Sequence, residues 1–582
     1  MANNTELIAQ CEAKARQWLT PDFDERTRQE VQAMLDDSDK TNLIESFYKD
    51  LEFGTGGLRG IMGAGSNRMN VYTVGMATQG FANYLKMNFA DREQISAVVC
   101  YDCRNNSDLY AKTVADIFSA NGIKVYLFSE MRPTPECSYA IRHFGAQAGV
   151  NITASHNPRE YNGYKAYWED GAQVLAPHDK GIIDEVNKVR IEDVKFKGNP
   201  ELIQLVDEDV DKPYLEQIKT LSIDPDVIKR QHDLKIVYTP LHGTGMTMIP
   251  RSLEFWGFDN VHCVKEQMVK DGNFPTVDRP NPEFAEALTL GLRDAKAIDA
   301  DILMASDPDA DRVGMACKND KGEWVLINGN QTCMIFLWYI ISNRKAKGLL
   351  KPTDFIVKTI VTTEVIRKIA EKQNIEMRDV YTGFKWIARE IRLSEGKQQY
   401  IGGGEESYGF LAEDFVRDKD AVSACSLLAE ICAFAKDQGK TLYDILMGIY
   451  TEYGFSKEFT VNVERPGKSG AEEIQQMMAD FRANPPKDLG GSRVVLWKDY
   501  KTLEATDAEG KTTKIDMPET SNVLQWFCDD DTKVSVRPSG TEPKIKFYIE
   551  VKGIMHNASE YPGLDAEGMK KIEAIKKSLH LN

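Results

Sequence analysis

The sequence predicts a multidomain protein of mixed α/β fold. Its 582 residues are too many for a single hydrophobic core, so we expect three to five domains. Along most of the chain, short apolar segments typical of strands alternate with amphipathic segments typical of helices, which favours α/β domains. The clearest strand candidates are residues 97–101, 125–128, 235–238 and 301–304.

The first 50 or so residues differ from the rest because their pattern is helical only. Leu7, Cys11, Ala15 and Trp18 recur at helical spacing among charged residues, and the apolar pattern continues to Leu43. We therefore expect a helical extension packed on the first domain. Further domain boundaries are expected near residues 207, 327 and 453, where charged or glycine-containing stretches interrupt the pattern.

The charge balance argues against a nucleic-acid-binding protein. The 89 acidic residues outnumber the 72 Lys and Arg residues, so the net charge is −17. Sequence-independent binding of nucleic acid depends on a cationic face. An anionic ligand of this protein must instead be bound by a local basic pocket. The expected partners are therefore small molecules, and the sequence leaves the oligomeric state open.

No segment predicts secretion or membrane insertion. Residues 1–20 lack the apolar core of a signal peptide. The most apolar run, residues 334–341, is too short to span a bilayer and indicates a buried helix. Ten cysteines without a disulfide-like spacing are typical of a reducing cytoplasm, where we expect the protein to reside. Cys100 and Cys103 form a CxxC pair, but no second pair completes a zinc site.

Ser155 is the first candidate for a catalytic residue. It lies in residues 153–158, TASHNP, which follow a strand-like run and end in a proline that prevents helix continuation. A serine at such a turn is presented to a cleft, and its hydroxyl can carry a covalent group, here a phosphoryl group.

Asp307, Asp309 and Asp311 form the second candidate site. These carboxylates alternate directly after the apolar residues 302–305 and so place their oxygens at one locus, as a hard divalent cation requires. A calcium-binding EF-hand would need glycine and glutamate where this chain has Arg312 and Lys318. The pattern therefore predicts a magnesium site.

Two glycine-containing segments indicate ligand binding. Residues 402–409, GGGEESYG, combine close backbone approach with the acceptor Glu405 and the hydroxyl of Ser407, which suits a sugar. Residues 537–543, RPSGTEP, provide an arginine, two hydroxyls and a glycine that suit a phosphate dianion. Together, the four segments describe a protein that moves phosphate on and off a sugar.

From about Leu51 to Tyr548 the chain resembles the α-D-phosphohexomutase superfamily. The four segments match, in order, the phosphoserine, magnesium, sugar and phosphate loops of that family. Further matches are residues 53–60, 101–104 and 382–386, whereas residues 238–243 and 274–276 resemble the branch of larger phosphoglucomutases that includes phosphopentomutases.

The resemblance implies three similar mixed α/β domains and a C-terminal α+β domain around a central cleft. With the boundaries above, the chain divides into a helical extension at 1–50, a phosphoserine domain at 51–206, a magnesium domain at 207–326, a sugar-binding domain at 327–452 and a phosphate-binding domain at 453–582.

The resemblance also implies roles for individual residues. Ser155 would be carried as phosphoserine and, with the three aspartates, would bind Mg²⁺; Lys165 would act as acid and base. Arg59 and Arg312 would contact the transferring phosphoryl group, with His156 in support. The sugar would contact Thr382, Gly383, Lys385, Glu405, Ser407 and Lys419. The second phosphate would contact Arg537, Ser539, Gly540, Thr541 and Lys546.

The activity that this implies is interconversion of glucose 1-phosphate and glucose 6-phosphate through a glucose 1,6-bisphosphate intermediate. Tyr408, Gly409 and Phe410 stand where enzymes acting on both glucose and mannose phosphates often carry a histidine, and this form resembles glucose-preferring members. The alternatives are a phosphopentomutase, a phosphomannomutase side activity, a sugar-bisphosphate synthase, and a non-catalytic sugar-phosphate sensor.

Overall fold

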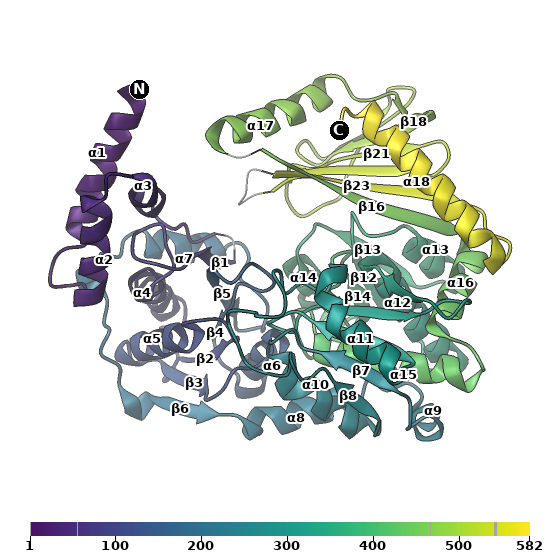
Figure 1. The fold of residues 1–582 in the computed structure, drawn as a ribbon, viewed down its shortest axis with the longest axis horizontal. Helices are drawn as coiled ribbons and strands as arrows, with labels where there is room; N and C mark the ends of the chain where they lie inside the picture. The colour runs from purple at the N-terminus through teal and green to yellow at the C-terminus, as the bar shows by residue number, and fades with distance from the viewer. Residues whose placement is uncertain (1, 55, 466, 540–543, 582) are drawn as a thin grey trace.

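The computed structural model describes residues 2–54, 56–465, 467–539 and 544–581, whose strands form four sheets (Figure 1). Three sheets lie in mixed α/β units, and a sheet-rich unit follows at the C-terminus. The predicted fold class is therefore confirmed. The four strand segments predicted from sequence form β2 (Ser96–Tyr101), β3 (Lys124–Phe128), β7 (Ile236–Thr239) and β9 (Ile302–Ser306). Among the described helices, none has both the length and the apolar character needed to cross a membrane.

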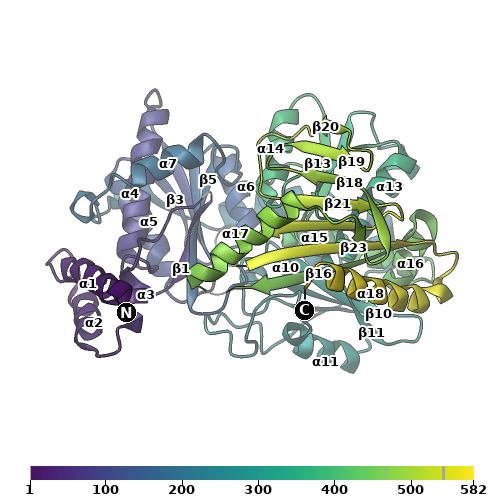
Figure 2. The same ribbon diagram turned by 90° about the horizontal axis from the view of Figure 1, so that it is seen from above.

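The chain begins with three helices, α1 (Ala2–Gln17), α2 (Glu25–Asp36) and α3 (Thr41–Phe47), which lie at one end of the molecule (Figure 2). Their apolar faces form a separate small core that includes Trp18, Phe23 and Phe47. Tyr72, in α4 (Val71–Asn88), joins this core, and its hydroxyl donates a hydrogen bond to Asp24. The three helices are thereby attached to the first α/β unit.

The first sheet has the order β1-β5-β4-β2-β3-β6. Its central strands β2 and β4 (Ala148–Ile152) are parallel and fully buried, whereas β5 (Tyr161–Trp168) pairs antiparallel with β4 and with β1 (Gly57–Ile61). The two edge strands are β1 and β6 (Ile203–Val206). The helices α4, α5 (Ser107–Ala120), α6 (Thr134–Phe144) and α7 (His178–Val186) belong to this unit.

The second sheet has the order β11-β10-β9-β7-β8, with β8 at Val261–Cys263, β10 at Val313–Lys318 and β11 at Trp324–Ile327. The third has the order β13-β12-β14-β15, with β12 at Asp354–Thr359, β13 at Glu376–Val380, β14 at Gln399–Gly404 and β15 at Phe410–Leu411. One hydrophobic core runs through both units, and α10 (Gly245–Trp256) packs against α15 (Ala421–Asp437) within it. The two units are therefore one packed body.

Seven further α-helices complete the second and third units in the described part of the chain. They are α8 (Glu208–Lys219), α9 (Pro225–Arg230), α11 (Thr289–Ala297), α12 (Gly329–Ala346), α13 (Val365–Gln373), α14 (Phe384–Ser394) and α16 (Leu442–Tyr453). Helix α12 contains the apolar run 334–341, which is buried as the sequence indicates.

The C-terminal unit is an antiparallel sheet with helices on one face. Its main path is β16-β23-β22-β21-β18-β19-β20, and β17 pairs with β18. Helices α17 (Gly467–Ala483) and α18 (Tyr561–Ser578) cover the face that carries Trp526 and Phe547 (Figure 1). The strands are β16 (Phe455–Glu464), β17 (Asp488–Leu489), β18 (Ser492–Asp499), β19 (Glu504–Asp507), β20 (Thr512–Lys514), β21 (Leu524–Cys528), β22 (Lys533–Pro538) and β23 (Lys544–Gly553).

A buried ionic network attaches the C-terminal sheet to the third unit. Lys533, only 1% exposed, lies 2.8 Å from Glu364 and 3.1 Å from Glu550, measured between the ammonium nitrogen and the carboxylate oxygens. The same ammonium donates a 2.9 Å hydrogen bond to the carbonyl of Thr362, and the hydroxyl of Thr363 donates to Glu550. Because this contact is ionic and buried, it depends on every partner being present.

Replacing Lys533 with methionine should therefore destabilise the attachment. The change removes the cation shared by Glu364 and Glu550, although Lys358 and Arg367 still contact Glu364 and Lys552 still contacts Glu550. The loss of these charged hydrogen bonds should cost about 1–3 kcal/mol in free energy of unfolding. Chemical denaturation of the full chain measures this loss. As a control, Lys229→Met removes the exposed pair with Asp226 and should leave the free energy of unfolding nearly unchanged, because solvent screens that pair. Equal small losses in both variants would contradict the assigned role of the network.

Candidate active site

The segment that carries Ser155 is the turn between β4 and β5. Ser155 is 4% exposed and has a φ of +51°, a conformation that non-glycine residues rarely adopt. The buried guanidinium of Arg104 stabilises this turn by donating hydrogen bonds to the carbonyls of Ser155 at 2.6 Å and Asn157 at 2.5 Å. It also donates to the carbonyls of Pro158 and Tyr161. A single side chain thus fixes the backbone around the serine.

The Ser155 hydroxyl lies between a carboxylate and an imidazole. It donates a 2.9 Å hydrogen bond to Asp307, and its oxygen is 3.1 Å from Nδ1 of His156. Since a hydroxyl has one proton, the tautomer with a proton on Nδ1 allows His156 to donate to the serine oxygen. Burial, with the nearby charges of Arg312 and Arg59, lowers the pKa of His156 well below its ordinary value. A neutral imidazole is therefore favoured beside Ser155.

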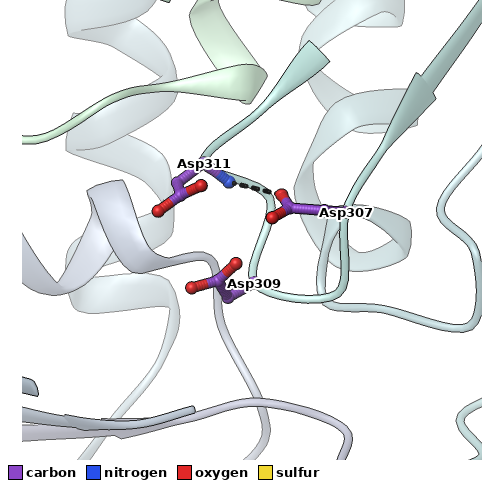
Figure 3. A group of neighbouring side chains, drawn as sticks. All are labelled: Asp307, Asp309 and Asp311. Atoms are coloured by element: carbon purple, nitrogen blue, oxygen red, sulfur yellow. Dashed lines mark hydrogen bonds between the residues drawn. The ribbon is translucent and has the colours of Figure 1, made fainter. Parts of the chain in front are cut away.

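The three predicted aspartates lie together in the loop between β9 and β10 (Figure 3). Asp307 and Asp309 are fully buried, Asp311 is 2% exposed, and one carboxylate oxygen of each lies within 4.8 Å of the others. The backbone N–H groups of Asp311 and Arg312 donate to Oδ1 of Asp307 at 3.2 and 3.1 Å, and Ala310 has a φ of +51°. The loop therefore curls around its own first carboxylate.

Cations from three units surround these carboxylates. Lys165 of β5 lies 2.7 Å from Asp309 and 3.2 Å from Asp311, and Lys419, just before α15, lies 3.0 Å from Asp311. Arg312 lies within 3.9 Å of both Asp307 and Asp311. Burial alone would raise the pKa of Asp311, but Lys419, Lys165 and Arg312 outweigh it, and the pKa falls below its ordinary value.

In contrast to Asp311, Asp307 and Lys165 have pKa values above their ordinary values. Burial and repulsion from Asp309 and Asp311 raise the pKa of Asp307 well above its ordinary value. Burial would lower the pKa of Lys165, yet attraction to Asp309 and Asp311 raises it instead. The ammonium form of Lys165 is therefore favoured at neutral pH.

The donor set of this cluster suits a metal ion. Oδ1 of Asp309 and Oδ1 of Asp311 are buried, and neither accepts a hydrogen bond from any residue that the structure describes. A buried carboxylate oxygen without a donor is costly, and a hard cation would satisfy it. The three aspartates could therefore bind a metal ion.

The predicted sugar loop follows β14 and lies against the aspartate loop. Arg312 pairs with Gly409 in an isolated bridge, and the N–H of Val313 donates to the carbonyl of Tyr408. Glu405 is 5% exposed and accepts a 2.8 Å hydrogen bond from the N–H of Gly383. The predicted residues of both segments are thus neighbours.

The remaining predicted sugar contacts are placed as follows. Ser407 and Thr382 are partly buried, and the hydroxyl of Thr382 has no partner among the described residues. Burial lowers the pKa of Lys385, whose ammonium lies 5.6 Å from the Trp386 ring centroid. Lys419 contacts Asp311, so the structure places it at the aspartate cluster.

The structure describes residues 537–539 of the predicted phosphate loop, at the end of β22. Arg537 and Lys546 are direct partners across β22 and β23, and the N–H of Ser539 donates to the carbonyl of Lys544. Gly540 and Thr541 lie outside the described residues. Burial lowers the pKa of Lys546, an effect partly offset by attraction to Glu406 of the sugar loop. The charges of Arg537 and Lys546 therefore both interact with Glu406 of the sugar loop.

Three residues that sequence reasoning did not assign also build the site. Arg104 fixes the serine turn, as described above. Thr134, the first residue of α6, donates from its hydroxyl to Oδ2 of Asp309 and from its N–H to the carbonyl of Asp309. Glu283 lies 3.1 Å from the guanidinium of Arg312. Arg59, which was predicted, donates to the side chain of Asn157 next to the serine turn.

Comparison with known proteins agrees with this architecture. Three family models of phosphoglucomutase/phosphomannomutase α/β/α domains match in order: domain I at residues 50–192, domain II at 212–322 and domain III at 328–453. A phosphoglucomutase of Staphylococcus haemolyticus is 35% identical over 90% of this chain and 94% of its own, and one from Staphylococcus aureus is 37% identical over 87% and 91%.

Solved structures show the same fold. A putative phosphomannomutase from Thermus thermophilus superposes with a TM-score of 0.66 at 21% identity, covering 91% of this chain and 99% of its own. Parafusin, a phosphoglucomutase from Paramecium, gives a TM-score of 0.65 at 16% identity, covering 91% and 96%. The fold and site thus define a member of the α-D-phosphohexomutase superfamily, as the resemblance predicted. The chain belongs to the phosphoglucomutase/phosphomannomutase family.

The hydrogen bonds of Arg104 lead to a testable expectation. Arg104→Lys keeps the charge but cannot reach all four carbonyls, because an ammonium lacks the planar fork of a guanidinium. We expect the variant to fold and to lose at least about tenfold in the activity proposed below, since small displacements of reacting groups are that costly. Circular dichroism and steady-state kinetics measure both effects. Wild-type activity in Arg104→Lys would contradict the role of this residue.

Proposed function

We propose that the protein is a phosphoglucomutase that interconverts glucose 1-phosphate and glucose 6-phosphate. The observation that carries the proposal is the 2.9 Å contact between the Ser155 hydroxyl and Asp307, within a buried cluster of three carboxylates and three cations. The relatives at 35–37% identity are phosphoglucomutases, which confirms the predicted class of enzyme. Sugar phosphates are the substrates that fit this class.

Ser155 is proposed to carry the phosphoryl group between the two positions of the sugar. In the first transfer, the bond between phosphorus and the serine oxygen breaks, and a sugar hydroxyl oxygen forms the new bond to phosphorus. The hydroxyl proton leaves for a base, and the serine oxygen regains a proton. The product at this stage is glucose 1,6-bisphosphate. The reverse transfer, after the bisphosphate reorients, returns the other phosphate to Ser155.

Lys165 and His156 are proposed to manage these protons. Lys165 is proposed to accept the proton of the attacking sugar hydroxyl and, as the ammonium, to donate a proton to the departing serine oxygen; the return step reverses these transfers. Neutral His156 donates from Nδ1 to the serine oxygen and so orients it. Arg312 and Arg59 would contact the phosphoryl oxygens, because guanidinium groups match phosphate geometry.

Mg²⁺ is the metal that we propose for the aspartate cluster. Asp307, Asp309 and Asp311 would hold it together with an oxygen on Ser155. When bound, the ion supplies positive charge that offsets the negative charge of the transferring group. The buried carboxylate oxygens without donors support this assignment.

The sugar and phosphate loops would determine which end of the sugar reacts. Glu405 and Ser407 would contact the secondary hydroxyls, together with Thr382, Gly383, Lys385 and Lys419. Arg537 and Lys546, with Ser539, Gly540 and Thr541, would bind the phosphate that does not react. Binding one phosphate there directs the opposite end of the sugar toward Ser155, which accounts for transfer between C1 and C6.

The cysteines support a reducing compartment, which we propose to be the cytoplasm. All ten are free thiols within the described part of the chain, and all but Cys263 are buried. Burial raises the pKa of Cys100 and Cys103, which disfavours the reactive thiolate.

The test is conversion of glucose 1-phosphate to glucose 6-phosphate with Mg²⁺ and a trace of glucose 1,6-bisphosphate. We expect rapid turnover that falls at least about 10³-fold in Ser155→Ala, because no side chain replaces the nucleophile. Removal of metal with a chelator should abolish turnover, and added Mg²⁺ should restore it. Ser559→Ala, an exposed serine of the C-terminal unit, is the matched control and should be unaffected.

The other candidate functions make different predictions in the same assay. Conversion of ribose 1-phosphate alone would indicate a phosphopentomutase, and net release of the bisphosphate would indicate a synthase. Full glucose turnover in Ser155→Ala would refute the phosphoserine mechanism. Binding of sugar phosphate with no turnover at all would favour a sensor.

A further inference from the structure

Residues 272–276, between β8 and α11, contact residues beside the serine turn at one end and residues beside the aspartate loop at the other. We call them the linking segment. The branch-specific sequence Phe274-Pro275-Thr276 lies within this segment, and the proposed reaction uses none of these residues. The segment belongs in sequence to the second unit, yet Phe274 is 2% exposed in the core of the first unit.

One end of the linking segment packs on the residues that fix the serine turn. The Phe274 ring centroid lies 5.2 Å from the guanidinium carbon of Arg104, whose hydrogen bonds stabilise the turn. The side chain of Asn105 donates a 2.9 Å hydrogen bond to Asn273. A side chain on Gly272 would lie 2.4 Å from the backbone nitrogen of Asn105, so the two backbones are in direct contact.

The other end of the segment joins a hydrogen-bond network. The amide of Gln267 donates to the Thr276 hydroxyl oxygen at 3.0 Å, and this hydroxyl is 2.8 Å from Nε2 of His242. Nδ1 of His242 lies 2.9 Å from the carbonyl of Val269, which can only accept, so the proton is on Nδ1 and Nε2 accepts from Thr276. Thr239 donates to Gln267. The side chains of Thr239, Gln267, Thr276 and His242 thus form one continuous hydrogen-bond network.

This network stabilises a strained turn beneath the aspartate loop. Leu241 and His242 have φ values of +48° and +66°, which cost energy in non-glycine residues. The next residue, Gly243, approaches Pro308 so closely that a side chain would lie 2.4 Å from its Cα. The N–H and the hydroxyl of Thr244 both donate to the carbonyl of Pro308. Pro308 lies between the aspartates at positions 307 and 309.

We propose that Phe274, Thr276 and His242 are positioning residues that set the serine turn at a fixed distance from the aspartate loop. The inference rests on the proposed function, in which phosphoryl transfer occurs between these two segments. The direct contact of Ser155 with Asp307 must change when the serine carries a phosphoryl group. The hydrogen bonds described for the Ser155 hydroxyl and the Asp307 carboxylate involve no residue of the linking segment, so the segment can maintain the alignment in both states.

The test removes each end of the linkage with conservative variants. Thr276→Val removes the hydroxyl with little change in shape, Thr276→Ser retains it, and Phe274→Leu removes the ring over Arg104. Thr113→Val, a buried threonine in α5 away from the segment, is the matched control. Two measurements apply: the single-turnover rate of phosphoryl transfer from phosphorylated enzyme to glucose 1-phosphate, and hydrogen–deuterium exchange of the full chain.

We expect Thr276→Val and Phe274→Leu each to slow single-turnover transfer by about tenfold to a hundredfold, with the KM for glucose 1-phosphate changed less than about threefold. Thr276→Ser and Thr113→Val should stay within about twofold of wild type. The double variant should be no slower than the slower single variant, since either change breaks the same linkage. Multiplicative losses in the double variant, or unchanged rates in both single variants, would overturn the proposal.

Hydrogen–deuterium exchange tests the linkage independently of activity. Thr276→Val should speed exchange in residues 307–312, and Phe274→Leu in residues 153–158, by about tenfold, with little change elsewhere in the sheets. If the wild-type enzyme lacked glucose phosphate turnover, the proposed function would fail while this result still decided the linkage. Unchanged exchange in both segments would refute the linkage itself.

Discussion

Asp311 can remain ionised in the interior only because cations lie beside it, and these cations contact the neighbouring aspartates as well. Lys165 comes from the first unit, Arg312 from the second and Lys419 from the third, so the charge of one loop is compensated by three units. An uncompensated buried charge costs several kcal/mol, which makes the assembled arrangement of the units a condition for the cluster. The rest of the site is built on this constraint.

The sheets explain how the loops converge. The serine turn begins directly after β4, the aspartate loop directly after β9 and the sugar loop directly after β14. All three loops therefore extend from the carboxyl ends of strands, where ligands bind in α/β sheets. The shared core of the second and third units keeps two of these loops in one rigid body. The first unit carries the serine. It contacts the aspartate loop through Thr134 and Lys165, and its core holds Phe274 of the linking segment.

Much of this could be predicted from local sequence patterns. Strand positions, the serine turn and the alternating aspartates follow from apolar runs and from residue types at fixed spacing, and the family resemblance ordered the loops. Contacts between distant residues could not be predicted in this way. Arg104 lies 51 residues before Ser155, and no local signal indicates that its guanidinium binds four carbonyls of that turn. Lys419 is predicted to contact the sugar, and its ammonium also lies 3.0 Å from Asp311, a contact that no local pattern indicates because the packing of α15 on the second unit determines it.

The central claim is that Ser155 and the aspartate cluster form one phosphoryl-transfer site. Its most direct test is peptide mass spectrometry of the full chain after incubation with glucose 1,6-bisphosphate, followed by glucose 1-phosphate with or without Mg²⁺. The account predicts one phosphoryl group, on Ser155, that glucose 1-phosphate removes only in the presence of Mg²⁺, and that persists in Asp309→Asn. A phosphoryl group on another residue, or its removal from Ser155 at an unchanged rate in Asp309→Asn, would contradict the account.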